Sequence, residues 1–161
     1  ERRRRRGRGV RGLAPAGGGS RVIAAHELAE VMRPPASRVL VVEDNADAAE
    51  TMRMVLELGG YDAVLAFDGA TGMAAARETR PRLVLSDIGL PGMDGYALAR
   101  ALRADPATAG VRLIAITGYG TAADRQRALE AGFDIHLVKP VPPERLLEEV
   151  AAALRDDTES S

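Results

Sequence analysis

The sequence predicts an α/β fold in which five short, buried strands alternate with five amphipathic helices. Three observations support this prediction. Short apolar runs recur without polar alternation, as in strands that are buried on both faces of a parallel sheet. Segments with apolar residues at helical spacing separate the runs, and glycine or proline marks several of the joints. Such an alternation with short loops implies right-handed crossovers and a doubly wound, three-layer arrangement.

The apolar runs place the strands. Each run is short and rich in valine, leucine, isoleucine or alanine, which suits a strand that is covered on both faces. Periodicity leaves the order of the strands in the sheet open. In chain order the runs are Val39–Val42, Ala63–Ala66, Leu83–Leu85, Leu113–Ile116 and Ile135–Val138.

Helical spacing is clearest in the first and the last of the predicted helices. Met52, Val55 and Leu56 follow an i, i+3, i+4 pattern in the first, and a similar pattern extends to Leu154 in the last. Boundary residues support the helices. Gly59-Gly60 end the first helix, Gly132 ends the fourth, Pro142-Pro143 begin the fifth, and Thr121 with Asp124 predicts a capping box.

The composition allows one globular domain and excludes several classes of protein. The chain has 161 residues, of which 46% are hydrophobic, so it can bury a core. The absence of cysteine excludes disulfide scaffolds, zinc-thiolate sites and cysteine nucleophiles. The two histidines, His26 and His136, are too far apart in sequence to suggest a His-rich metal site. No apolar run is long enough to cross a bilayer, and we expect a cytoplasmic location without membrane insertion.

Charge divides the chain into a basic arm and an acidic domain. Residues 1–38 contain ten Arg and three Glu, whereas the remaining 123 residues have a net charge of −8. We expect residues 1–37 to be a mostly disordered, Gly/Arg-rich arm and linker, with a short helix near residues 22–32. The domain then spans residues 38–155, and residues 156–161 form a disordered tail. The Arg2–Arg6 run permits nucleic-acid, targeting or anionic-membrane contact, but a solvated tail is the favoured interpretation.

Polar residues follow four of the five predicted strands. Glu43 and Asp44 follow the first, Asp87 the third, Thr117 the fourth and Lys139 the fifth. The second strand is followed by Asp68-Gly69. In an open α/β sheet, ligands bind beyond the carboxyl ends of the strands. The sequence therefore predicts a charged site at this edge of the sheet.

Three carboxylates at one edge require a compensating positive charge. At a separation of about 5 Å and an effective dielectric constant of about 20, each pair repels by roughly 3 kcal/mol. Lys139, the only lysine of the chain, supplies one charge, and its compact ammonium differs from the planar arginine used elsewhere. Mg²⁺ accepts carboxylate, water and phosphate oxygens and can supply the rest. A carboxylate in such a site can attack phosphorus to form an aspartyl phosphate.

Four motifs in this order resemble the receiver domain of two-component response regulators: Val39–Asn45, Leu83–Gly95, Ile116–Gly118 and Val138–Pro140. The resemblance extends from about Arg38 to Leu154. It implies a flavodoxin-like (βα)5 fold with strand order 2-1-3-4-5 and phosphorylation-dependent signalling in a phosphorelay. It does not imply a turnover enzyme, but at most self-catalysed phosphotransfer and autodephosphorylation.

The resemblance also implies roles for the acidic residues. Asp87 is expected to accept a phosphoryl group from a phosphohistidine on a sensor histidine kinase or a histidine phosphotransfer protein. Mg²⁺ is expected to bind Asp44 and Asp87 directly, Glu43 through water, and the backbone carbonyl of Gly89. Asp94 lies in the same loop, but it precedes a helix, so we expect an N-cap there.

The remaining implied roles concern signalling. Lys139 is expected to pair with Asp87 and to precede a cis bond to Pro140, and Thr117 to bind a phosphoryl oxygen. His136 stands where the family usually has Phe or Tyr as a switch residue, so the usual aromatic switch is in doubt. Tyr119 is a candidate gate over the phosphate. Gly118 and Gly120 on either side of it suggest a flexible turn rather than a phosphate loop.

The partner surface expected from the resemblance is the face of the fourth helix, fifth strand and fifth helix, on a monomer or weak homodimer. Few residues follow Leu154, so we expect either a stand-alone receiver or the terminal receiver of a hybrid sensor histidine kinase. The sequence of the segment Asp87–Tyr96 resembles hybrid-kinase receivers and favours the second possibility. One alternative is a haloacid-dehalogenase-like phosphatase, but it needs a second Asp where Gly89 stands. Another is added nucleic-acid contact through the basic arm, which we consider unlikely.

Overall fold

The computed structural model describes residues 37–160, with side chains described as far as Arg155. Residues 1–36 and 161 are not described. The disordered arm and the short helix near residues 22–32 thus lie outside the described residues and stay predictions.

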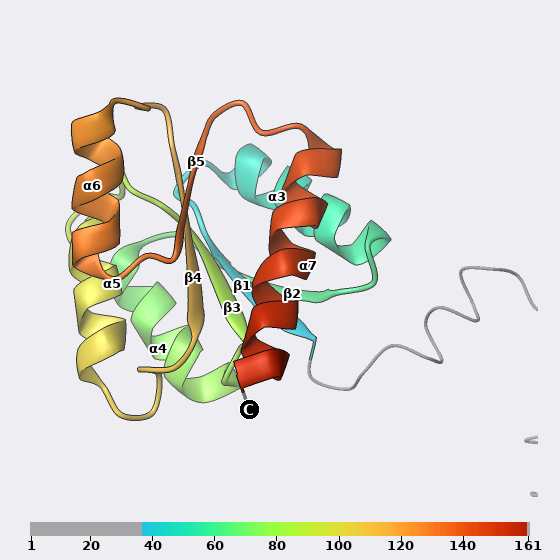
Figure 1. Cartoon of the computed structure of the whole chain (residues 1–161), viewed down its shortest axis with the longest axis horizontal. Coiled ribbons are helices and arrows are strands. Elements are labelled where there is room, and N and C mark those ends of the chain that lie inside the picture. Colours follow the sequence, from blue (N-terminus) through green and yellow to red (C-terminus); the bar gives the residue numbers. More distant parts are fainter. Residues whose placement is uncertain (1–36, 161) are drawn as a thin grey trace, which may run out of the picture. The chain divides into compact units, whose positions relative to one another are not determined.

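All strands of the described chain form one parallel, five-stranded sheet in the order β2-β1-β3-β4-β5 (Figure 1). This is the order that the resemblance implied. Every predicted apolar run is a strand, and four of the runs gain flanking polar residues. The strands are β1 (Arg38–Val42), β2 (Asp62–Ala66), β3 (Leu83–Asp87), β4 (Arg112–Thr117) and β5 (Ile135–Val138).

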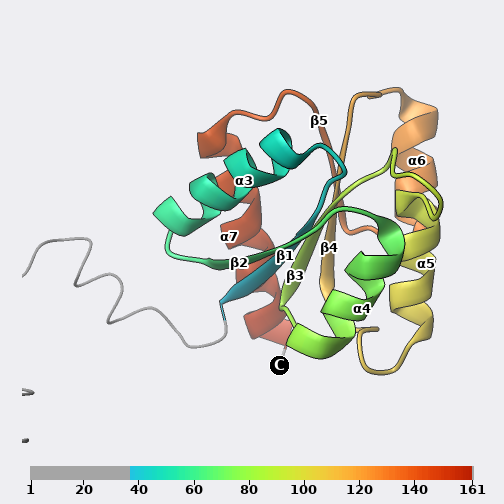
Figure 2. The same cartoon turned by 180° about the vertical axis from the view of Figure 1, so that it is seen from behind.

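Five helices cover the two faces of this sheet. Figures 1 and 2 show α3 and α7 on one face and α4, α5 and α6 on the other, so the three-layer, doubly wound (βα)5 architecture is confirmed. The helices are α3 (Ala46–Leu58), α4 (Gly69–Thr79), α5 (Gly95–Ala104), α6 (Ala122–Ala131) and α7 (Pro143–Ser160). No helix among the described residues has the length and apolar character needed to span a membrane.

Side-chain caps begin four of these helices. Asn45, Asp68 and Asp94 each accept a hydrogen bond from the backbone N–H three residues on, which satisfies a donor that the helix leaves free. Thr121 and Asp124 form the predicted capping box. The N-cap role expected for Asp94 is therefore present.

Two sequence expectations need correction. Helix α7 continues to Ser160, so residues 156–160 are helical where a disordered tail was expected. No glycine or proline follows Pro143 in this segment, and nothing in the sequence ends the helix at residue 155. The outer strands β2 and β5 are only partly covered, because they lie at the edges of the sheet.

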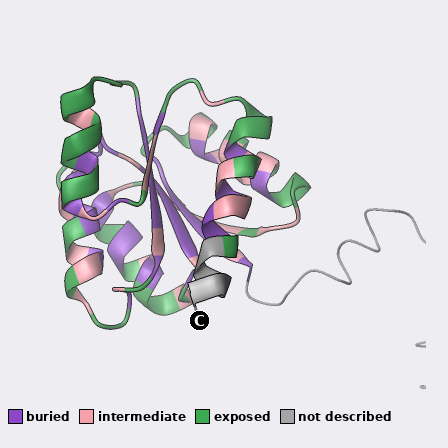
Figure 3. Cartoon of the chain, in the orientation of Figure 1, coloured by how far each residue is buried: buried purple, intermediate pink, exposed green. Residues whose placement is uncertain are grey.

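The core consists of two apolar layers, one on each side of the sheet (Figure 3). On one side Leu40 and Val84 pack with residues of α4, α5 and α6, such as Leu98. On the other side Val41 and Leu85 pack with residues of α3 and α7. Central strands buried on both faces hold the strand ends in fixed positions, and these ends form the candidate site.

Candidate functional site

The carboxyl ends of β1 and β3 lie side by side and bring three carboxylates together. Chain connections leave β1 and β3 toward opposite faces of the sheet, which is the switch point where α/β folds bind ligands. One oxygen from each of Glu43, Asp44 and Asp87 lies within 4.8 Å of the others. The sequence predicted this cluster from strand ends alone.

Glu43 is the buried member of the cluster, with a side chain that is 2% exposed. Its Oε2 accepts a hydrogen bond from the backbone N–H of Asn45 (3.1 Å), and its Oε1 accepts one from Lys139 Nζ (3.0 Å). Burial raises the pKa of Glu43, and these hydrogen bonds oppose the rise only in part. Both oxygens are engaged, which suits an indirect role beside a cation more than direct coordination.

Lys139 connects Glu43 with Asp87. Its Nζ lies 3.0 Å from Glu43 Oε1 and 3.2 Å from Asp87 Oδ2. Partial burial acts to lower the pKa of Lys139, but the hydrogen bond to Glu43 and the charge of Asp87 outweigh burial and raise it. The ammonium is therefore charged at neutral pH. The peptide bond from Lys139 to Pro140 is cis.

Asp87 ends β3 and points its carboxylate at the loop that follows. Its Oδ1 accepts a hydrogen bond from the backbone N–H of Gly89 (3.2 Å), which places Gly89 beside the cluster. The side chain is 12% exposed, so a small donor can reach it from solvent. One oxygen of Asp87 is thus bonded to the loop after β3 and the other to Lys139.

Thr117 ends β4, the strand next to β3. It is 4% exposed, and its Oγ1 accepts a hydrogen bond from the backbone N–H of Tyr119 (3.2 Å). Its carbonyl accepts one from the backbone N–H of Lys139 (2.7 Å), so the ends of β4 and β5 are joined at the site. Tyr119 itself is 75% exposed and lies beyond this pair of strand ends.

His136 lies on β5, opposite Ala115 of β4, on the side of the sheet that α6 covers. Its ring is partly buried, and Nε2 is buried without a hydrogen-bond partner among the described residues. Burial lowers the pKa of His136, and the charge of Arg125 lowers it further against the opposing charge of Asp124. The ring is thus neutral at pH 7.

The supporting roles of three residues near the site, Asn45, Gly69 and Gly95, were not predicted from the sequence. Asn45 donates its backbone N–H to Glu43 while its side chain caps α3. At Gly95 a Cβ would lie 2.5 Å from the backbone oxygen of Asp87, and at Gly69 one would lie 2.5 Å from that of Met93. The loop between β3 and α5 therefore packs tightly against the first residues of α4 and α5. A glycine directly after an N-cap aspartate, in Asp68-Gly69 and Asp94-Gly95, was the available signal.

The donor set fits Mg²⁺. Carboxylate oxygens are hard ligands, and Mg²⁺ takes one or two of them while keeping several waters. Asp44 is exposed, and one of its carboxylate oxygens lies within 4.8 Å of one oxygen of Glu43 and one of Asp87, so these side chains can share an ion. A divalent cation would relieve the repulsion that a single ammonium leaves among three carboxylates.

Comparisons with known proteins agree with this geometry. The family model of the response regulator receiver domain matches residues 39–151. The DNA-binding response regulator MtrA of Mycobacterium tuberculosis is 42% identical over 118 residues, which are 73% of this chain and 50% of MtrA. The regulator RpaA of Synechocystis is 34% identical over 73% of this chain and 49% of RpaA. The chain thus spans about half the length of the curated relatives it matches.

Solved structures give the same result. A CheY-like receiver domain protein from Methanospirillum hungatei is 31% identical with a TM-score of 0.71, over 78% of this chain and 98% of that one. The receiver domain of a histidine kinase from Syntrophus aciditrophicus is 34% identical with a TM-score of 0.70, over 75% and 92%. None of these matches supports the phosphatase alternative. The chain belongs to the response regulator receiver domain family and has its flavodoxin-like fold.

Proposed function

We propose that Asp87 accepts a phosphoryl group from a phosphohistidine of a sensor histidine kinase or a histidine phosphotransfer protein. The supporting observation is that Asp87 ends β3 between two other carboxylates and Lys139 Nζ. A carboxylate oxygen of Asp87 attacks phosphorus, the P–O bond forms as the P–N bond breaks, and the histidine ring keeps the electron pair. Asp87 thereby becomes an acyl phosphate.

Lys139 neutralises part of the negative charge at the site, and the acidic residues would hold a Mg²⁺ ion that neutralises the rest. Lys139 leaves the Asp87 carboxylate to meet a phosphoryl oxygen, and Glu43 holds its ammonium in reach. Asp44, Asp87 and the Gly89 carbonyl would hold Mg²⁺, with Glu43 acting through water. When bound, Mg²⁺ supplies positive charge beside the phosphoryl oxygens.

The phosphorylated state is read through Thr117 and the face formed by α6, β5 and α7. Thr117 donates its hydroxyl to a phosphoryl oxygen, which draws the loop after β4 inward. Helix α6 follows this loop and buries only Ala128 and Ala131, with Arg127 lying 4.3 Å from the Tyr96 ring centroid. A helix with so few anchors can shift at small energetic cost, and a downstream protein partner detects the change.

The chain acts as a signalling domain, with chemistry limited to its own phosphorylation and dephosphorylation. Tyr119 gates water access to the phosphate and so sets its lifetime, and His136 replaces the usual aromatic switch. We place the domain in the cytoplasm, where kinases that use ATP form phosphohistidine, as a monomer or weak homodimer. It serves either as a stand-alone receiver or as the terminal receiver of a hybrid kinase.

Phosphorylation of the purified chain tests the proposal. With acetyl phosphate and MgCl₂, the intact mass of the wild type should increase by one phosphoryl group, and that of Asp87→Asn should not change. Asp68→Asn is the matched control, because Asp68 follows β2 at the same edge and asparagine caps α4 equally well. Phosphorylation of Asp87→Asn at the wild-type rate would refute the acceptor role. An unchanged rate in excess EDTA would refute the metal role.

A further inference from the structure

A groove of about 520 Å³ runs between α6, β5 and α7 (the helices are labelled in Figure 1). Arg125 of α6 and Arg145 of α7 line it from either side, and His136 and Val138 of β5 line it between them. Both arginines are exposed. The groove therefore has cationic sides and a mostly uncharged floor.

The positive charge of this groove is not neutralised within it. No Asp or Glu is among the residues of the described chain that line the groove. Arg125 makes no ion pair with any residue that the structure describes. Arg145 pairs with Glu149 one turn along α7 at 2.8 Å, but its side chain is 55% exposed, so this pair exchanges readily.

The floor of the groove is apolar. Val138 is 44% exposed, and Val141 with two prolines continues the surface toward α7. His136 is neutral at pH 7 for the reasons given above, so it adds polarity without charge. An occupant therefore needs an aliphatic group as well as negative charge.

We propose that this groove binds an acidic segment of the partner protein, with a carboxylate between Arg125 and Arg145 and an aliphatic side chain on Val138. The inference rests on the proposed function in taking this face as the output surface, and adds the chemistry of the partner. A nucleic acid fits less well, because phosphate backbones need an extended basic surface.

The groove is coupled to the phosphorylation site through shared loops. Gly120 and Pro140 line it, and they lie three residues after Thr117 and one residue after Lys139. A Cβ at Gly120 would lie 2.7 Å from Val138 Cγ2, so the loop after β4 packs directly on the floor. Movement of Thr117 therefore changes the groove, and by linkage an occupant changes the phosphorylation equilibrium.

A peptide-display library selected against the full chain, with and without acetyl phosphate and MgCl₂, tests the inference. Enriched peptides should contain several Asp or Glu residues and at least one Leu, Ile or Val. Their affinity, measured by fluorescence anisotropy, should fall about tenfold or more in the double variant Arg125→Gln/Arg145→Gln. The matched control is Arg100→Gln, an exposed arginine of α5 outside the groove, which should bind as the wild type does.

Several results would overturn the inference: no enriched peptides, peptides without acidic residues, or equal binding to the double variant. Tighter binding of a duplex oligonucleotide at the same arginines would assign the groove to nucleic acid. Self-association that the double variant abolishes would assign it to a second copy of the chain. Phosphorylation is measured separately by intact mass. A wild type that is phosphorylated on Asp87 but binds no acidic peptide refutes this inference alone, whereas an unphosphorylated wild type refutes the proposed function.

Discussion

The two edges of the sheet differ in what their charged side chains contact. At the carboxyl edge, three carboxylates lie close together, and two of them, those of Glu43 and Asp87, share a single ammonium. At the amino edge, Arg38, Arg82 and Arg112 form a row, because the backbone N–H of Arg82 donates to the carbonyl of Arg38 and that of Arg112 to the carbonyl of Arg82. Like charges thus gather at both edges, but with different partners.

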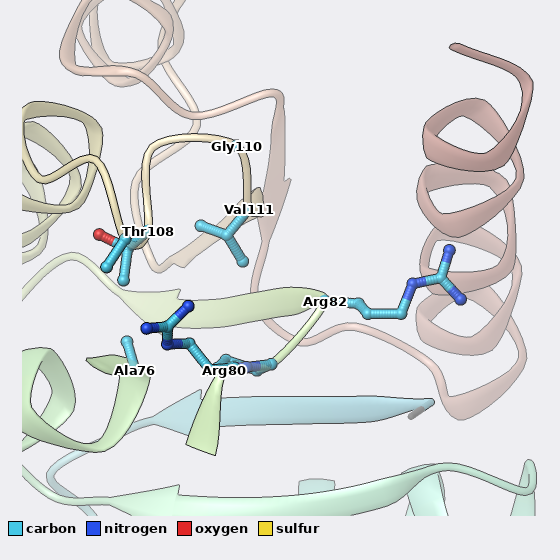
Figure 4. Close-up of a pocket in the computed structure, with 8 residues that line it drawn as sticks. Ala76, Arg80, Arg82, Thr108, Gly110 and Val111 are labelled. Carbon is cyan, nitrogen blue, oxygen red and sulfur yellow. The ribbon is translucent and has the colours of Figure 1, made fainter. Parts of the chain in front are cut away.

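Two of these arginines, Arg38 and Arg82, bind acceptors that the fold provides. Arg38 donates to Asp62 Oδ2 (3.1 Å) and to the carbonyl of Thr79 (3.0 Å). Figure 4 shows Arg82 extending away from the pocket of about 270 Å³ at this edge, and its Nη2 donates to the carbonyl of Leu154 on α7 (3.4 Å). These charges join strands to helices and loops, so their role is structural.

Arg103, on α5 near the same edge, makes the largest set of such bonds. Its guanidinium donates to the carbonyls of Gly132, Ala109 and Val111 and to Asp134 Oδ2. Asp134 in turn accepts from the backbone N–H of Leu113 (2.9 Å). Charged groups whose hydrogen bonds the protein satisfies contribute to stability, whereas charged groups left unsatisfied are available for chemistry.

The largest expected effect on stability is that of Arg103→Ala. Removal of the guanidinium leaves several partly buried carbonyls without donors, so we expect a loss of about 2–3 kcal/mol in the free energy of unfolding. Chemical denaturation measures it. The extent of Asp87 phosphorylation should not change, and Arg77→Ala, which removes one exposed ion pair to Asp105, is the control with little effect. Loss of Asp87 phosphorylation in a folded Arg103→Ala variant would contradict the assignment of a structural role to the charges of the amino edge and a chemical role to those of the carboxyl edge.

At the carboxyl edge, removal of a charge is expected to increase the free energy of unfolding. Asp44→Asn removes one of the mutually repelling carboxylates, so without metal the variant should be more stable than the wild type by about 0.5–1 kcal/mol. The same variant should lose most of the increase in melting temperature that Mg²⁺ gives the wild type. Thermal unfolding with MgCl₂ and with EDTA measures both. A variant less stable than the wild type in EDTA would contradict the comparison.

The smallest expected effect on the free energy of unfolding is that of His136, which belongs to neither edge cluster. Its pKa is lowered in the folded chain by burial and then by Arg125, so the unfolded chain takes up the proton first as pH falls. Its contribution to stability is complete above about pH 6.5 and is lost as pH falls below this value. Unfolding curves of wild type and His136→Phe between pH 7.5 and 5.5 should diverge slightly at the acid end. Parallel curves would show that the ring is not in this environment.

Strand ends were predictable from the sequence because parallel strands deliver their terminal residues to one edge. Glu43, Asp44, Asp87, Thr117 and Lys139 were located in this way, and the caps at Asp94 and Thr121 followed from local chemistry, whereas those at Asn45 and Asp68 were not predicted. The pairing of Lys139 with Glu43 was not predictable, since the two residues are 96 positions apart and their contact depends on side-chain conformations. The close approach of Gly95 to the Asp87 carbonyl likewise depends on how α5 packs, which periodicity does not encode.

The only lysine of the chain lies at the candidate site, with a side chain that is 37% exposed. Amine-selective reagents consequently have one side-chain target in the whole sequence besides the α-amino group. Covalent labelling of Lys139, followed by mass spectrometry, would report on the site without any engineered probe. Ligands that cover the ammonium would slow the labelling, and ligands that draw it away from Glu43 and Asp87 would accelerate it.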